Sequence, residues 1–321
     1  MLLNTPVDFQ NNLVKYSHKH NFLLLGSCFS DEIGLRLLAG KIPALSNPFG
    51  TTFNPLSIFK ILENKAGLDN SLIVHNQDLW FHHDLHSSIF GYSKQELNQK
   101  IEALNQKLSS FLAKTDVLIL TFGTAFVHRL QQNCSFVGNC HKQPAQLFTK
   151  RILEVEEIIQ GFDNAYTKIN PATQIILNIS PVRHTKDGIP ENQLSKSTLR
   201  VACAKLEQKY SNVTYLPSYE KVLDDLRDYR FYKSDLIHPN ELATDIIYTA
   251  FCNAFFSPET ISLLTKIKNI STSIQHKPLY NKSIAYADFL KQLLENTKIL
   301  NEKIDMSLEI IEINKLISTP C

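Results

Sequence analysis

The architecture of this chain follows from one early stretch of sequence, Phe22-Leu23-Leu24-Leu25-Gly26-Ser27-Cys28-Phe29-Ser30-Asp31-Glu32. Its first four residues are an apolar run of strand length, and the run ends abruptly at Gly26. A helix is expected to follow at once, because a serine can cap it and two acidic residues favour the positive end of its dipole. Cys28 is therefore predicted to lie in a strand-to-helix turn.

Apolar runs and helical patterns alternate farther along the chain. Strands are predicted at residues 117–120, 174–179 and 213–215, and helices at residues 94–112, 149–166 and 193–210. This alternation indicates an α/β fold with a doubly wound parallel sheet. Ligands bind such sheets beyond the carboxyl ends of the strands, where loops 26–30, 121–128 and 180–187 are expected.

The composition changes after Ser257-Pro258 and then favours helix. An apolar stripe of helical period follows, made of Ile284, Phe289, Leu293, Leu294, Ile299, Leu300, Ile304 and Leu308. We therefore expect two parts, an α/β domain over residues 1–256 and a helical extension over residues 257–321. The helix must bury its stripe, either against its own domain or against a second subunit in a homo-oligomer.

The bulk composition predicts a soluble protein of the cytoplasm. Hydrophobic residues make up 43% of the 321 residues, and no apolar segment reaches the roughly 20 residues that cross a bilayer. The 33 basic and 31 acidic residues nearly cancel, so neither nucleic acid nor a membrane is an expected partner. Residues 1–19 lack the features of a secretory signal.

The cysteine and histidine patterns do not indicate a metal site. The six cysteines are scattered and fit a reducing compartment, and Cys134, Cys140 and His141 lack the spacing of a zinc site. A second polar cluster, expected in a loop or edge strand without a preformed ligand scaffold, contains Trp80, His82, His83, Asp84 and His86. We predict no metal and no cofactor.

Two short motifs carry the chemistry. Gly26-Ser27-Cys28 offers a nucleophile at the end of the first strand, and Asp235-Leu236-Ile237-His238 offers a carboxylate and an imidazole late in the α/β region. Asp235 and His238 are separated by about one helical turn, so their side chains can meet. Taken alone, the second motif also fits a surface aspartate beside a histidine that caps a helix beginning near Pro239.

Five segments resemble the GSCFA family of SGNH/GDSL-type hydrolases, in order and over roughly residues 20–255. They are Leu25-Gly26-Ser27-Cys28-Phe29-Ser30, Asn47-Pro48-Phe49-Gly50-Thr51, Thr121-Phe122-Gly123-Thr124-Ala125, Ser180-Pro181-Val182-Arg183-His184 and Ser234-Asp235-Leu236-Ile237-His238-Pro239. The resemblance implies a three-layer α/β/α, flavodoxin-like hydrolase fold. It also implies an esterase or acyltransferase activity, without naming a substrate.

The resemblance implies a catalytic set and leaves its nucleophile open. The superfamily signature Gly-Asp-Ser, laid on Gly26-Ser27-Cys28, makes Cys28 the nucleophile. The helix N-terminus and a neighbouring imidazole are expected to lower the pKa of its thiol. In the other register Ser27 attacks. In both, His238 is the general base and Asp235 orients its ring.

The set of oxyanion donors that the resemblance implies is incomplete in this chain. The backbone N–H of the nucleophile is one donor, and Gly50 resembles the superfamily's second donor. The superfamily's third donor is an asparagine in Gly-x-Asn-Asp, but this chain has Gly123-Thr124-Ala125. Thr124, Asn54 and His86 are the candidates to replace it. Without a replacement, the rate is expected to fall on the order of a hundredfold or more.

Two further groups of side chains have both a functional and a structural interpretation. Arg183 and His184 follow a predicted strand, and they either bind an anionic part of a substrate or form a surface salt bridge. His86 and Trp80 either line the pocket or pack at the surface.

The sequence supports three functions. The first is an enzyme that forms an acyl intermediate on Cys28 or Ser27 and passes the acyl group to water or another hydroxyl. Its substrate would be a small-molecule or carbohydrate ester. The second is a catalytically weak SGNH-like module that binds a carbohydrate or acylated ligand, which Ala125 favours. The third is an oligomeric scaffold held by the C-terminal helix. The complete set of nucleophile, base and orienting acid favours the enzyme.

Overall fold

A computed structural model of the chain describes residues 5–9, 14–280 and 283–318. Its central sheet has five parallel strands in the order β10-β9-β5-β1-β2. They are β1 (Phe22–Gly26), β2 (Ala44–Ser46), β5 (Val117–Phe122), β9 (Gln174–Ile179) and β10 (Val213–Leu216). The predicted α/β fold with a parallel sheet is confirmed. The strand order reverses between β1 and β5, and this switch point is where doubly wound sheets bind ligands.

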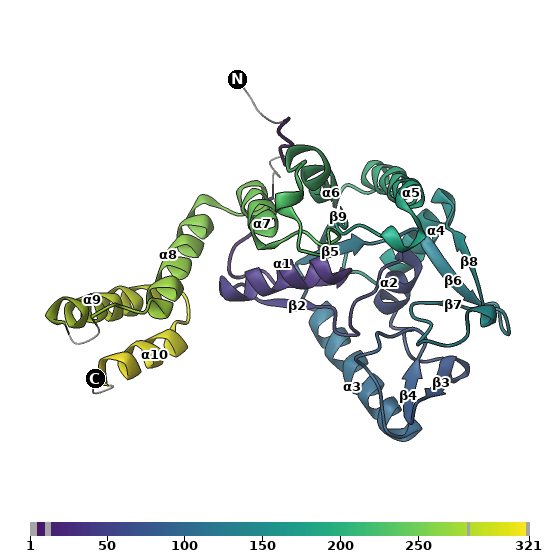
Figure 1. Cartoon of the computed structure of the whole chain (residues 1–321), viewed down its shortest axis with the longest axis horizontal. Coiled ribbons are helices and arrows are strands. Elements are labelled where there is room, and N and C mark those ends of the chain that lie inside the picture. Colours follow the sequence, from purple (N-terminus) through teal and green to yellow (C-terminus); the bar gives the residue numbers. More distant parts are fainter. Residues whose placement is uncertain (1–4, 10–13, 281–282, 319–321) are drawn as a thin grey trace.

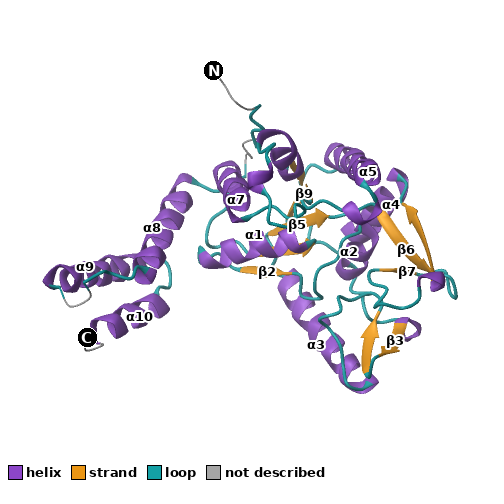
Figure 2. Cartoon of the chain, viewed as in Figure 1, coloured by secondary structure: helices purple, strands orange, loops and turns teal. Residues whose placement is uncertain are grey.

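Helices cover both faces of the sheet, as Figure 2 shows. Successive β1 side chains point to opposite faces: Phe22 and Leu24 join one buried cluster, and Leu23 and Leu25 join the other. α1 (Cys28–Ala39) and α7 (Glu241–Phe255) pack on the first face. The second cluster includes side chains of α2 (Pro55–Leu62), α3 (Lys94–Leu112), α4 (Val155–Tyr166) and α5 (Ile189–Lys209). The result is a three-layer α/β/α domain.

Two small antiparallel sheets lie outside the central sheet. One pairs β3 (Ile73–Asn76) with β4 (Leu79–His82), and the other has the order β7-β6-β8. Its strands are β6 (Phe126–Leu130), β7 (Phe136–Val137) and β8 (Phe148–Ile152). Short helical turns complete the domain at Asn70–Leu72, Ala145–Leu147, Thr185–Asp187, Ser218–Glu220, Lys221–Asp225 and Tyr229–Phe231.

The start of the helix predicted at residues 149–166 is wrong. β8 occupies its first residues and pairs with β6, with Phe148 buried and residues 149–151 exposed. Glu154 and Glu157 form a capping box, in which each side chain accepts from the other residue's backbone N–H, and α4 begins at Val155. The helix starts where these orphan N–H groups find acceptors.

The C-terminal helices project from the α/β domain as an arm (Figure 1). They are α8 (Pro258–Gln275), α9 (Ile284–Asn301) and α10 (Ser307–Ser318), and they share a separate apolar cluster. The single helix expected over the apolar stripe is divided, because the chain turns between α9 and α10. The Asn301 side chain accepts from the Met306 N–H at 2.7 Å and closes this turn. None of the described helices is long and apolar enough to cross a membrane.

Candidate active site at the β1–α1 turn

The junction of β1 and α1 depends on a glycine. Gly26 has φ +139°, and a Cβ at this position would lie 2.1 Å from the Thr121 carbonyl oxygen of β5. Only glycine therefore lets β1 end this close to its neighbour. The next N–H, from Ser27, donates to the same carbonyl at 3.1 Å and fixes the turn at the switch point of the sheet.

The two candidate nucleophiles have different surroundings. The Ser27 side chain is 1% exposed, and its Oγ accepts from the Phe29 N–H at 3.3 Å as the N-cap of α1. Cys28 is the first residue of the helix and is half-buried. Both residues line the pocket described below, but the Ser27 hydroxyl already has a structural partner.

Burial and nearby acids raise the pKa of the Cys28 thiol. Burial is the largest cause, and the negative charges of Asp31 and Glu32 in the first turns of α1 come next. The Cys28 backbone N–H at the helix N-terminus, and after it the charge of Lys233, lower the pKa but are outweighed. The lowered pKa expected from the helix N-terminus is therefore wrong, and the free thiol is protonated near neutral pH.

Asp235 and His238 form the pair that their spacing predicts. The Asp235 carboxylate Oδ2 lies 2.7 Å from His238 Nδ1, and its Oδ1 accepts from the backbone N–H groups of Ile237 (2.9 Å) and His238 (3.0 Å). Leu236 has φ +60°, which closes the loop tightly enough for these contacts. The His238 N–H is the largest cause that lowers the Asp235 pKa, to about 2.

An ionised Asp235 has a direct consequence for the imidazole. The carboxylate accepts a hydrogen bond from the Nδ1–H of His238, which keeps the proton on Nδ1 and leaves Nε2 as the basic nitrogen. Both side chains are about two-fifths exposed, at 40% for His238 and 44% for Asp235. This pair therefore lies at the mouth of the site and not in its interior.

Cys28 and His238 line one pocket of about 340 Å³ at the carboxyl ends of β1, β5 and β9. Its other lining residues come from the loops after these strands and from the His238 loop: Ser27, Phe53, Gly123, Ser180, Val182, Arg183, His184, Thr185, Lys186 and Ile237. The structure therefore brings the predicted nucleophiles, the predicted base and two of the predicted binding residues to one cavity.

Arg183 and His184 take part in this pocket differently. The Arg183 guanidinium lies over the ring of Tyr232, 4.2 Å from its centroid, and forms no salt bridge with any described residue. Burial, followed by the charge of Lys196, lowers the His184 pKa. Arg183 is therefore the one of these two that keeps its charge near neutral pH.

The four proposed oxyanion residues lie outside the lining of this pocket, and each has another contact. The Gly50 N–H donates to the Asn47 carbonyl at 2.8 Å, and Asn54 caps α2. The Thr124 hydroxyl lies 3.0 Å from the Ser195 hydroxyl and accepts from the Phe126 N–H. His86 Nδ1 lies 2.9 Å from the Ser88 hydroxyl.

The backbone near β5 offers no substitute donor. The N–H groups of Gly123 and Thr124 both donate to the Phe53 carbonyl, at 2.7 and 3.0 Å. The Cys28 N–H is different, because no carbonyl of a described residue accepts it. Of the predicted oxyanion donors, the Cys28 N–H is therefore the one that has no carbonyl acceptor and could bind an oxyanion.

Lys196 of α5 is a site residue that the sequence analysis missed. Its side chain is 1% exposed, and its ammonium donates to the carbonyls of Gly123 and Ser180, each at 2.7 Å. Both carbonyls belong to residues that line the pocket, so Lys196 ties two walls of the site together. Burial lowers the Lys196 pKa to about 7, and the nearby Cys28 opposes this shift.

The polar cluster around His82 serves the structure. The His82, His83 and Asp84 side chains are buried. His82 Nε2 lies 3.0 Å from the Asp69 carbonyl and His83 Nδ1 lies 2.7 Å from the Asn139 carbonyl. Over the part of the chain that the structure describes, no three His, Cys, Asp or Glu side chains are grouped to hold a metal ion.

Comparisons with known proteins give two family matches. The sequence profile of the GSCFA family matches residues 21–251, and that of the GSCFA domain protein, C-terminal domain, matches residues 267–319. No curated protein matches the sequence. One similar solved structure is a crystal structure of a carbohydrate esterase family 3 from Talaromyces cellulolyticus. It has 10% sequence identity and a TM-score of 0.36, over 77% of this chain and 98% of that chain.

Proposed function

The chain belongs to the GSCFA family, and from this premise we propose that it is an SGNH-type esterase or acyltransferase with Cys28 as its nucleophile. One observation carries the proposal: Cys28 and His238 line one pocket beside the switch point of the sheet, and His238 is hydrogen-bonded to Asp235. This is the minimal set for acyl transfer, with a nucleophile, a base and a group that orients the base.

The proposed reaction has two steps. His238 Nε2 takes the Cys28 thiol proton as the sulfur attacks the ester carbonyl, and the leaving alkoxide receives that proton from His238. The product of this step is a thioester on Cys28. Water or an acceptor hydroxyl then attacks the thioester, again losing its proton to His238, and the released sulfur recovers a proton. The raised thiol pKa makes the base necessary in the first step.

The Cys28 N–H is the donor that would stabilise the tetrahedral oxyanion. Because the N–H groups of Gly50, Gly123 and Thr124 have carbonyl acceptors, we expect turnover to be slow for an enzyme of this class. The same observation favours a second candidate, a weakly active module that binds a carbohydrate or acylated ligand in this pocket. We place either function in the cytoplasm, since Cys28, Cys134, Cys140, Cys203 and Cys252 are free cysteines.

The test uses p-nitrophenyl acyl esters and thioesters with intact-mass detection of acyl adducts. We expect one acyl group on the wild type, none on Cys28→Ala, and an adduct that persists in Ser27→Ala. His238→Ala should accumulate little adduct and lose turnover. Cys134→Ala removes an exposed thiol outside the pocket and is the matched control. An adduct that is lost only in Ser27→Ala would transfer the nucleophile to Ser27. No adduct with any ester or thioester would leave the binding module as the function.

A further inference from the structure

Arg183 lines two neighbouring spaces in the α/β domain. One is the pocket that contains Cys28, and the other is a hollow of about 280 Å³ whose lining includes Tyr219, Tyr229 and Tyr232. Of the described residues that line these two spaces, none is Asp or Glu. A ligand that reaches from the Cys28 pocket to Arg183 therefore meets a positive charge and no carboxylate on the walls.

The protein does not neutralise the charge of Arg183. No carboxylate of a described residue forms a salt bridge with its guanidinium. Asp224 and Asp228 line a third hollow together with Arg183, but each of these acids has its own cation. Their partners are Arg227 and Arg230. A partly buried cation without a counter-charge destabilises the fold, and an anionic ligand would compensate it.

Two tyrosines hold the Arg183 guanidinium. Its central carbon lies 4.2 Å from the centroid of the Tyr232 ring and 5.4 Å from that of the Tyr229 ring. Burial is the largest single cause that acts on its pKa and lowers it, but the phenol groups of these tyrosines together raise it. A guanidinium has more N–H groups than two phenols can use, so donors remain for a ligand.

Backbone contacts fix Arg183 beside the proposed base. Its N–H donates to the carbonyl of Ile237, the residue before His238, at 3.2 Å. Tyr232 forms a β-bridge with Pro239, the residue after His238. The guanidinium, the ring that holds it and the imidazole therefore belong to one connected unit. A group bound to Arg183 would keep a constant position relative to the reacting carbonyl.

Asn192 supplies a second donor in the hollow beside Arg183. Its side chain is 6% exposed, and its Oδ1 accepts from the His184 N–H at 2.8 Å, which orients the amide. Among the described residues nothing accepts from Asn192 Nδ2, and this atom is not fully enclosed. Since Asn192 and Arg183 line the same hollow, an acceptor there can bind both.

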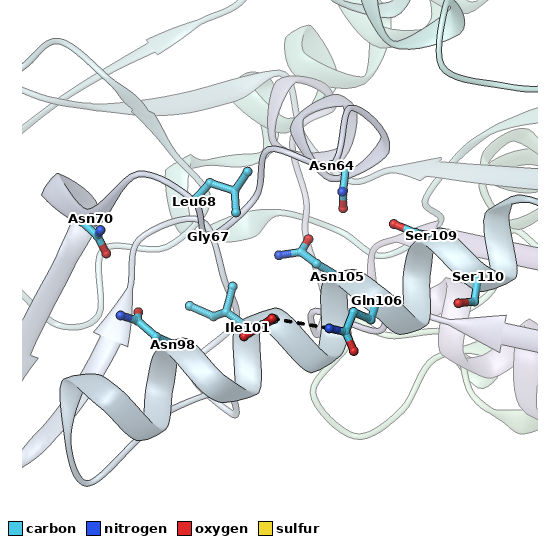
Figure 3. A pocket seen from close by; sticks show the side chains of 11 residues that line it. Asn64, Gly67, Leu68, Asn70, Asn98, Ile101, Asn105, Gln106, Ser109 and Ser110 are labelled. Atoms are coloured by element: carbon cyan, nitrogen blue, oxygen red, sulfur yellow. Dashed lines mark hydrogen bonds between the residues drawn. The ribbon is translucent and has the colours of Figure 1, made fainter.

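A wider hollow lacks these features. It has about 650 Å³ and lies between α3 and the loop that follows α2 (Figure 3). Glu102 is among its lining residues, and none of the described residues around it is Lys, Arg or His. The amide atoms of Asn105 are enclosed there, so a ligand cannot reach them. An anion has donors beside Arg183 and none with a positive charge beside α3.

We propose that the substrate is an ester that carries a carboxylate besides its reacting acyl group, and that Arg183 and Asn192 bind this carboxylate. This specificity rests on the function proposed for Cys28. The ester carbonyl lies in the Cys28 pocket, and the carboxylate accepts from the guanidinium and from the Asn192 amide. Because the anion is apart from the reacting atoms, its binding stabilises the substrate and the transition state alike and lowers KM.

The test compares pairs of aryl esters that differ in one charge. The acyl pair is mono-4-nitrophenyl adipate and its methyl ester, and the alcohol pair is 4-acetoxyphenylacetate and its methyl ester. In at least one pair we expect kcat/KM of the anionic member to exceed that of the neutral member roughly tenfold or more, mainly through KM. A preference in the first pair places the carboxylate on the acyl part of the substrate, and one in the second pair places it on the alcohol part.

Three variants test the residues. Arg183→Gln should bring the ratio of the two kcat/KM values close to one. Asn192→Asp keeps the acceptor for the His184 N–H but adds a negative charge beside the bound carboxylate, so it should lower the ratio as far. This second variant decides if Arg183→Gln fails to fold. Arg129→Gln is the matched control, because Arg129 also lies over an aromatic ring but lines neither space, and it should keep the wild-type ratio.

Equal kcat/KM values within both pairs, or a wild-type ratio in Arg183→Gln or Asn192→Asp, would overturn the carboxylate site and leave the acyl chemistry of Cys28 in place. If no ester reacts, the function proposed for Cys28 fails instead, and binding of adipate decides on Arg183. Saturation-transfer NMR with Cys28→Ala should then detect adipate, and adding Arg183→Gln should weaken binding roughly tenfold or more. No binding, or the same affinity in both proteins, would reject the site.

Discussion

At the scale of single residues, the reactivity of Cys28 depends on charges in the first turns of α1. Burial and then Asp31 raise the pKa of its thiol above the ordinary value of 9.0. Alkylation by iodoacetamide requires the thiolate, so its rate on the wild type should still be rising above pH 9. Asp31→Asn removes one negative charge, which favours the thiolate and shifts the rate profile to lower pH.

The measurement is the alkylation rate of Cys28 between pH 7 and 10, followed by peptide mass. Asp288→Asn, an exposed carboxylate on α9, is the control and should leave the profile in place. A profile in Asp31→Asn that coincides with the wild type would show that the charge of Asp31 does not raise the Cys28 pKa.

Lys196 gives a prediction about stability. Its pKa is about 7 in the folded protein and roughly 10.4 in an unfolded chain. Between these values the unfolded state binds a proton that the folded state does not, so the contribution of Lys196 to stability rises with pH. Lys196→Met removes this titration. The free energy of unfolding of the wild type, minus that of the variant, should increase by up to about 1.4 kcal/mol per pH unit.

Urea unfolding at pH 7, 8 and 9 measures this difference. Lys205→Met changes a half-exposed lysine of the same helix, paired with Glu156, and should show no comparable slope. Parallel pH dependences for the wild type and Lys196→Met would mean that Lys196 keeps its proton throughout this range.

The sequence predicted Cys28, Asp235 and His238 because a motif at a strand end and a pair of residues at close spacing can be recognised without knowing how the chain packs. Lys196 was missed because a lysine in a helix is normally on the solvated side. A signal was present: Asn192, Ser195 and Lys196 continue the spacing of Leu199 and the other buried positions of α5. The contacts of Thr124 could not be judged from the sequence, because its partners, the Phe53 carbonyl and the Ser195 hydroxyl, are distant in the chain.

At the scale of elements, removing the N-cap of α1 distinguishes a structural role of Ser27 from a chemical one. Ser27→Ala should lower the free energy of unfolding by about 1 kcal/mol, because the Phe29 N–H loses its acceptor. Acylation of Cys28 should persist. Ser93→Ala removes the equivalent cap of α3 and should cost a similar amount. Urea unfolding and intact mass check both variants, and an acylation defect confined to Ser27→Ala would give Ser27 a chemical role.

The elements that sequence reasoning found are those with long apolar runs or strong helical period. The strands predicted at 22–25, 117–120, 174–179 and 213–215 and the helix at 94–112 are confirmed. β2 was missed because it has three residues and none of them is fully buried, so it leaves no apolar run in the sequence. Residues 149–152 of β8 were assigned to the helix because residues 149–151 are polar and exposed, so the strand shows no apolar alternation in the sequence.

At the scale of the whole molecule, the position of the boundary between domain and arm can be argued from two apolar clusters. Ile261 and Leu264 pack against the cluster of the α/β domain, whereas Ile267 belongs to that of the arm. All three are in α8. We therefore propose that the division between the two units falls within α8, close to residue 266. The arm also contacts the domain through the Lys41–Glu309 salt bridge, at 2.7 Å.

Two truncated chains test this division. A chain of residues 1–265 retains Ile261 and Leu264 and should keep the Cys28 pocket, because the core of the arm lies beyond it. A chain of residues 1–257 loses both side chains and should be less stable than the longer chain, by on the order of 2 kcal/mol. Urea unfolding measures the difference, and equal stability would place the boundary before α8. Sedimentation of the full chain beside residues 1–265 tests whether the arm joins two subunits, since association through the arm requires the mass to fall to one chain when the arm is removed.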